Sequence, residues 1–146
     1  MTATQSLLDS IAYVAWHAQV LRTEEPGRVV VGQPDRPDLH NYFGTTHAGA
    51  IYTLAETAAG VAADGIARPL DGFILLGAAE VRYTRRAEGA LEAEAQLDTA
   101  TDRAALERAF AADGRASLAV AVTIRDPGGA TVFDGIFHYA MRRRSR

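Results

Sequence analysis

Cysteine is absent from the 146 residues of this chain. Its absence excludes disulfide bonds, a thiol nucleophile and thiolate metal sites, and it fits a reducing cytoplasm. Long apolar runs are also absent, since no uninterrupted stretch approaches the roughly 20 residues that span a bilayer. The polar residues that follow Met1 predict no signal peptide. We therefore expect a cytoplasmic protein that makes no use of a membrane.

Several common functional signals are missing as well. The net charge is −3, so no global basic field is present to attract nucleic acid. HExxH, GxSxG and Cys/His clusters do not occur, so we predict no metal, no other cofactor and no serine hydrolase. The length and a hydrophobic content of 48% predict one globular domain over residues 1–146.

The periodicity of apolar residues predicts an order of helices and strands. Before residue 70 we expect a helix over residues 6–21 stopped by Pro26-Gly27, a strand at 28–32, and a long helix capped by Thr45 or Thr46 that ends near Asp64-Gly65. After it we expect strands at 73–86, 91–98, 116–125 and 130–141, with a short helix at 102–112. Glu88-Gly89 fits a turn between the first two of these strands, Asp126–Gly129 fits a hairpin between the last two, and the arginine-rich tail reads as a solvated end. Strands that follow helices in this way indicate an α+β protein with an antiparallel sheet, wrapped around the buried helix.

One carboxylate stands alone in the long helix. Glu56 is the only acidic residue between Asp38 and Asp64, and its helical neighbours are apolar on nearly every face. Such a helix is buried, and a lone carboxylate in an apolar setting is unfavourable unless it is paired or used. We interpret Glu56 as the main candidate for a functional residue. The alternative is a carboxylate that faces an arginine or a water-filled crevice.

Two motifs lie close together around Glu56. They read Asn41-x-x-Gly44-x-x-His47-x-Gly49 and Leu54-x-Glu56-x-x-x-Gly60. This pattern resembles the hotdog-fold acyl-CoA thioesterases, and most closely their phenylacetyl-CoA and 4-hydroxybenzoyl-CoA branch, whose members carry N-x-x-G-x-x-H-G-G and then an Asp or Glu on the helix. The resemblance covers roughly residues 26–141, with Ala48 in place of the first glycine after the histidine.

The resemblance implies a fold and an assembly. The fold would be a hotdog: an antiparallel sheet around one long helix, here with an extra N-terminal helix. Two such units would dimerise and form the active sites at their interface, so we expect a homodimer or homotetramer. The implied substrate is an acyl-CoA.

The resemblance also implies roles for individual residues. Glu56 would act as general base or nucleophile, and the backbone N–H groups around Ala48 and Gly49 would bind the thioester oxygen. Alanine at position 48 keeps its N–H, although its methyl group narrows the approach. Asn41 would orient the water or the thioester, with a plain turn residue as the alternative. His47 would hydrogen-bond near the thioester or hold the loop.

Substrate binding is assigned to a further group of residues. The resemblance places basic residues against the coenzyme A phosphates near Arg82, Arg85 and Arg86, with a solvated strand face as the alternative. The tail residues Arg142, Arg143, Arg144 and Arg146 form a rival basic patch. Tyr52, with Phe73 and Leu76, is expected to set the length of the acyl pocket.

Other functions remain open beside acyl-CoA hydrolysis. One is a hotdog protein that binds acyl-CoA or acyl chains without turnover. A hotdog dehydratase would need a catalytic histidine placed differently from His47. A structural or regulatory oligomer would show no affinity for coenzyme A.

Overall fold

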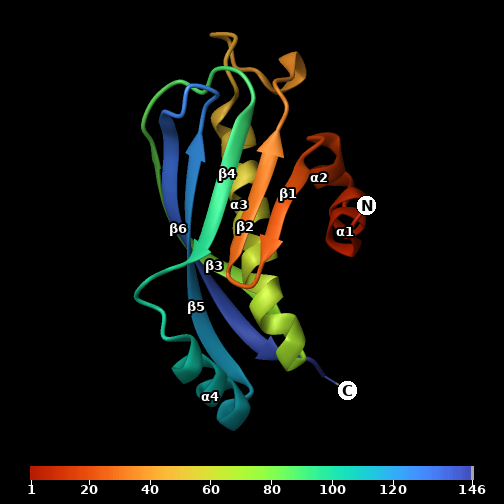
Figure 1. Ribbon diagram of the computed structural model, residues 1–146, viewed down its shortest axis with the longest axis vertical. Helices are drawn as coiled ribbons and strands as arrows, with labels where there is room; N and C mark the ends of the chain where they lie inside the picture. Colours follow the sequence, from red (N-terminus) through yellow and green to blue (C-terminus); the bar gives the residue numbers. More distant parts are fainter. Residues whose placement is uncertain (146) are drawn as a thin grey trace.

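Six antiparallel strands form one sheet that curves around a long central helix in the computed structural model, which describes residues 1–145 (Figure 1). The strands are β1 (Val20–Glu25), β2 (Arg28–Gln33), β3 (Gly72–Tyr83), β4 (Leu91–Leu97), β5 (Arg115–Arg125) and β6 (Thr131–Arg143). Their order across the sheet is β1-β2-β4-β5-β6-β3. This is the α+β hotdog fold, as the sequence predicted.

The helix α3 (Ala48–Ala67) packs against the sheet through its small side chains. Leu54, Ala55, Ala58, Ala59 and Ala63 have no exposed surface. Alanine side chains allow the helix axis to lie close to the strands, and the large core residues come mainly from the sheet. Phe133, Phe137, Val120 and Val122 are among them.

Both ends of α3 differ from the prediction. The helix begins after His47, whose side chain is the N-cap, because the Thr45 hydroxyl is held by Asn41. At the other end the helix continues through Gly65 to Ala67 and passes into a 3-10 turn, η2 (Arg68–Leu70). Proline at position 69 then prevents a regular helix from continuing.

The N-terminal segment is not one helix over residues 6–21. It consists of α1 (Ala3–Ser10) and α2 (Ala12–Trp16), separated by Ile11 in an extended conformation. Residues from Val20 onward form the strand β1, which the prediction missed. Pro26 and Gly27 connect β1 to β2, with φ +76° at Gly27, which suits glycine at the third position of a turn.

The strands after α3 were located correctly, but one connection was wrong. β3 and β4 are not hairpin partners, because β3 pairs with β6 and β4 lies between β2 and β5. The segment around Glu88-Gly89 is therefore a crossover loop rather than a tight turn. The hairpin at Asp126–Gly129 and the helix α4 (Arg103–Asp113), capped by Asp102, are confirmed. A short 3-10 turn, η1 (Pro37–Leu39), precedes the loop that leads to α3.

Candidate active site

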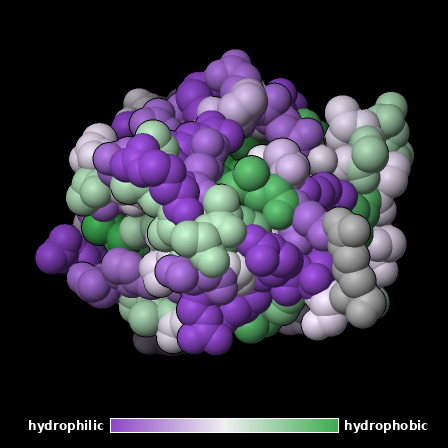
Figure 2. Space-filling view, turned by 90° about the horizontal axis from the view of Figure 1, so that it is seen from below, coloured by the Kyte–Doolittle hydropathy of each residue, from purple (hydrophilic) through white to green (hydrophobic). Residues whose placement is uncertain are grey.

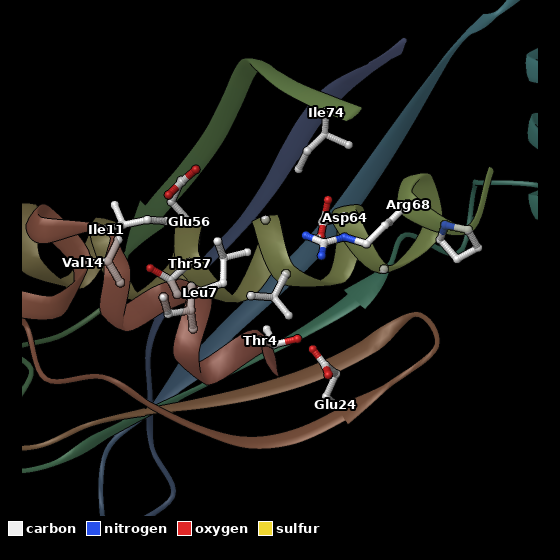
Figure 3. Close-up of a pocket in the computed structure, with 15 residues that line it drawn as sticks. Thr4, Leu7, Ile11, Val14, Glu24, Glu56, Thr57, Asp64, Arg68 and Ile74 are labelled. Carbon is white, nitrogen blue, oxygen red and sulfur yellow. The ribbon is translucent and has the colours of Figure 1, made fainter. Parts of the chain in front are cut away.

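A cavity of about 520 Å³ lies between the two N-terminal helices and α3. Figure 3 shows its walls: α1 and α2 on one side, α3 on the other, and Ile74 of β3 above. Its lining is mostly aliphatic and comprises Thr4, Leu7, Leu8, Ile11, Val14, Glu24, Glu56, Thr57, Gly60, Val61, Asp64, Gly65, Arg68, Pro69 and Ile74. Glu56 lies beside Ile11 and Val14 at one end of the cavity, whereas Asp64 lies farther along α3 (Figure 3).

Glu56 is half-buried in this cavity wall. Among residues 1–145, no side chain forms an ion pair with its carboxylate. Burial raises the pKa of Glu56 above its ordinary value of 4.5, because desolvation disfavours the charged form. A carboxylate with these properties is a better proton acceptor once it is ionised.

Two buried hydroxyl groups lie near Glu56. A Cβ added at Gly60 would meet the Tyr139 hydroxyl at 3.7 Å and Glu56 Oε1 at 4.0 Å, so both groups lie close to Gly60. The hydroxyls of Tyr139 and Thr57 have no hydrogen-bond partner among the described residues, although Tyr139 is only 3% exposed and Thr57 only 4%. Polar atoms buried in this way normally bind water or a ligand.

These hydroxyl groups were missed by sequence reasoning. Tyr139 occupies an inward position of β6, and the same alternation that buries Phe137 carries its hydroxyl under α3. Desolvation, and then the charge of Glu56, raise the pKa of Tyr139 well above its ordinary value. Tyr139 is therefore a neutral hydrogen-bond donor at neutral pH.

Tyr52 lies one helical turn before Glu56 and does not line this cavity. Its ring contacts Phe137 with centroids 5.6 Å apart. Desolvation, together with the negative charge of Glu56, raises the pKa of Tyr52. Phe73 and Leu76, which were expected to limit the pocket with Tyr52, are also absent from its lining.

The N-terminus of α3 forms a separate part of the candidate site. The Gly49 N–H donates to His47 Nδ1 at 2.9 Å, so this N–H already has an acceptor. The Ala48 N–H has none among the described residues and is exposed. His47 and Gly49 line a smaller cavity of about 260 Å³, beside Tyr13 and Trp16.

Glu56 and this helix N-terminus do not meet within one chain. Eight residues separate Ala48 from Glu56, which places them about 12 Å apart along the helix axis. Glu56 lines the larger cavity, whereas His47 and Gly49 at the start of the helix line the smaller one. A single thioester cannot contact both ends within one protomer.

Asn41 holds the loop before α3. Its Oδ1 accepts from the backbone N–H groups of Phe43 at 2.9 Å and Thr45 at 3.2 Å, and its Nδ2 donates to the Thr45 hydroxyl. These hydrogen bonds are those of a turn residue, which was the alternative role expected for Asn41. One N–H of its amide has no acceptor in the described part of the chain.

The three arginines near the end of β3 differ in their surroundings. Arg82 is exposed on the strand and lies 3.8 Å from Asp134. Arg85 and Arg86 lie beyond the strand, which ends at Tyr83, rather than within it. The Arg86 guanidinium packs over the Phe43 ring at 4.5 Å, so this segment is adjacent to the loop before α3.

The arginines at the C-terminus are at the opposite end of the molecule (Figure 1). Arg142 and Arg143 belong to β6, so they are not a solvated tail, and Arg143 donates to the Phe110 and Ala111 carbonyls at the end of α4. Arg144 is exposed, and Arg146 lies outside the described residues. Figure 2 views this end and shows a mainly hydrophilic surface with scattered apolar groups.

Residues 1–145 contain neither a metal-ion site nor a membrane-spanning helix. No group of three or more His, Asp or Glu side chains is placed to hold a metal ion. No helix is long and apolar enough to cross a membrane.

Comparison with known proteins places the chain in a family. Residues 8–140 match the family described as "Domain of unknown function (DUF4442)", and the chain belongs to it. No curated protein matches the sequence. The family match does not extend to the phenylacetyl-CoA and 4-hydroxybenzoyl-CoA branch, which stays a prediction.

Solved structures with the same fold are described as thioesterases. A protein of unknown function from Pseudomonas aeruginosa, described as a "probable thioesterase", is 26% identical with a TM-score of 0.85, over 97% of this chain and 94% of that one. A thioesterase from Staphylococcus aureus, solved as a mutant, is 16% identical with a TM-score of 0.75, over 90% and 98%. A thioesterase family protein from Silicibacter pomeroyi is 16% identical with a TM-score of 0.69, over 95% and 93%. This chain thus has a thioesterase-like hotdog fold.

Proposed function

We propose that this protein is an acyl-CoA thioesterase, which hydrolyses an acyl-CoA to a free acid and coenzyme A. The observation that carries the proposal is Glu56: a half-buried carboxylate without an ion-pair partner in the described chain, at the end of an apolar cavity. Thioester hydrolysis needs such a base or nucleophile. The similarity to a protein described as a "probable thioesterase" also supports it.

The proposed chemistry uses Glu56 in one of two ways. As general base, it takes a proton from a water molecule whose oxygen attacks the thioester carbon. The C–S bond then breaks, and the coenzyme A thiolate takes up the proton. As nucleophile, the carboxylate itself attacks the thioester carbon, the C–S bond breaks and the coenzyme A thiolate leaves. Water then hydrolyses the resulting anhydride to the free acid and the Glu56 carboxylate, and the proton released is taken up by the thiolate. In both routes the Ala48 N–H stabilises the developing oxyanion.

The proposal requires a second copy of the chain. Glu56 and the Ala48 N–H are about 12 Å apart along α3, so a thioester reaches both only if each comes from a different protomer. β3 is an edge strand whose side chains Leu75 and Leu76 are 56% and 37% exposed. A long apolar edge of this kind favours pairing with another strand. We propose a homodimer, alone or within a homotetramer, that pairs through β3.

Arg85 and Arg86 are the proposed contacts for the coenzyme A phosphates. Both are exposed. Arg86 packs over the ring of Phe43, which lies in the loop that leads to His47. The backbone bond from Thr46 N–H to the Ala87 carbonyl, 3.0 Å long, fixes the two segments side by side. A carrier bound there would present its thioester toward the N-terminus of α3.

A second candidate is an acyl-CoA binding protein that does not hydrolyse its ligand. It is favoured by one observation: the Gly49 N–H already donates to His47, so this N–H is not free to bind an oxyanion. Release of free thiol from short, long and aromatic acyl-CoAs tests the first proposal directly. Binding of the same compounds by calorimetry without thiol release would establish the second candidate instead.

A further inference from the structure

The cavity beside Glu56 has polar groups at both of its ends along α3 and aliphatic side chains between them. Glu56 and the unpartnered, buried Thr57 hydroxyl form its polar end. Its aliphatic lining consists of Leu7, Leu8, Ile11, Val14, Val61 and Ile74, and none of the described residues that line it is aromatic. At the far end Arg68 pairs with Asp64 at 2.6 Å (Figure 3). An acyl thioester with a linear tail would place its polar head at Glu56 and its apolar chain along these aliphatic side chains.

We propose that this cavity holds the acyl chain of the substrate, and that the substrate class is linear aliphatic acyl thioesters of about ten carbons or more. The proposal rests on the proposed function, because the thioester is placed at Glu56. The helices α1 and α2 then serve as the outer wall of the chain site. They form a specificity element outside the two motifs around Glu56.

The dimensions of the cavity agree with a chain of this length. Glu56 and Arg68 both line it and lie about 18 Å apart along α3. An extended chain advances about 1.3 Å per carbon when its C–C bonds are about 1.5 Å long. The volume of about 520 Å³ is within the range of about 300–1,000 Å³ that is typical of ligand sites.

The wall formed by the N-terminal helices is anchored yet incompletely buried. The Tyr13 hydroxyl lies 3.0 Å from the Thr53 hydroxyl on α3, and Gln5 accepts from the Leu21 N–H at 2.7 Å. Even so, Leu7 and Ile11 are 43% and 44% exposed while they line the cavity. Large apolar side chains left this exposed gain from a ligand that removes them from water.

Substitutions at two positions on α3 test the length of the acyl chain that the cavity accepts. A Cβ added at Gly65, which lines the cavity, meets nothing within 4 Å, so the backbone there has room for the start of the Gly65→Leu side chain. Gly65 lies about 13 Å beyond Glu56 along the helix, and Val61 about 7 Å. Gly65→Leu should therefore shorten the accepted chain to about ten carbons, and Val61→Phe to about six. Ala112→Leu, on the exposed end of α4, is the matched control.

The experiment measures binding and turnover separately. Binding of butanoyl-, octanoyl-, dodecanoyl- and tetradecanoyl-CoA is followed by calorimetry, and kcat/KM by thiol release. In the wild type and in Ala112→Leu, affinity should rise with chain length up to at least dodecanoyl-CoA. Gly65→Leu should weaken dodecanoyl-CoA binding at least about tenfold, the effect of leaving about two methylene groups unburied, and leave butanoyl-CoA unchanged. Val61→Phe should extend the loss to octanoyl-CoA.

The outcomes separate the chain site from the proposed hydrolysis. Ligand binding that follows this pattern without any thiol release would keep the chain site and refute the thioesterase. Hydrolysis with the same chain-length profile in all variants would refute the chain site and keep the thioesterase. If Gly65→Leu instead dissociates the oligomer in light scattering, a second copy of the chain occupies the cavity and the proposal fails.

Discussion

Replacing Glu56 with glutamine tests the proposed chemistry most directly. The amide keeps the shape of the side chain and cannot accept a proton or attack a thioester. The carboxylate has no ion-pair partner among the described residues, so its replacement leaves no positive charge without a counter-ion. We expect kcat to fall at least about 100-fold, or about 2.7 kcal/mol in the barrier, the lower range for the loss of a catalytic base. Thiol release from the best acyl-CoA measures it.

The same variant should be no less stable than the wild type. Burial raises the pKa of Glu56 in the folded protein above its ordinary value of 4.5. Between the unfolded and the folded pKa, the folded protein binds the proton more tightly, so the free energy of unfolding falls as pH rises through this window. Above the folded pKa, the burial of the charged carboxylate lowers the free energy of unfolding by its full amount. Glutamine removes this destabilisation. Below the unfolded pKa, the wild type and Glu56→Gln should have similar free energies of unfolding.

Activity should follow the ionised carboxylate. The acid side of the kcat/KM profile of the wild type should have its midpoint above pH 4.5, and Glu56→Asp should retain part of the activity with a shorter reach. Circular dichroism and urea unfolding serve as folding controls. A well-folded glutamine variant with near-normal turnover would refute the role of Glu56 and direct attention to His47.

Three further predictions concern other parts of the proposed mechanism. Replacing Arg85 and Arg86 with alanine should raise KM more than it lowers kcat, with a smaller effect in high salt, because exposed charges are screened; an equal effect of Arg144→Ala would move phosphate binding to the C-terminal end. Leu75→Lys should convert the dimer to an inactive monomer in light scattering, because it places charge on the β3 edge; an active monomer would refute the shared site. Tyr139→Phe should keep or raise the free energy of unfolding in urea, since the hydroxyl has no described partner to lose; a loss of more than about 1 kcal/mol would mean that it is hydrogen-bonded in solution.

Local pattern was sufficient for much of the fold. The alternation of Leu91 to Leu97 and the turn at Asp126–Gly129 predicted β4 and the β5–β6 hairpin, because strand periodicity and turn chemistry are set by neighbouring residues. The N-terminal helices were merged and β1 was missed, because helical spacing can continue by chance into a strand. Ile11, where the chain breaks, is not a helix-breaking residue. The pairing of β3 with β6 is a long-range contact that local periodicity does not contain.

The candidate site, like the fold, was predictable from the sequence only in part. Glu56 was predictable because one carboxylate among alanines violates the pattern of a buried helix, and that violation is visible in the sequence. The acceptor for the Gly49 N–H, the hydroxyl of Tyr139 near Gly60, and the aliphatic wall from α1 and α2 were decided only by tertiary structure. They depend on where β6 and the N-terminal helices pack against α3. The sequence by itself therefore determined the fold class and the candidate carboxylate, and packing determined what surrounds that carboxylate, because a cavity is shaped by residues far apart in the chain.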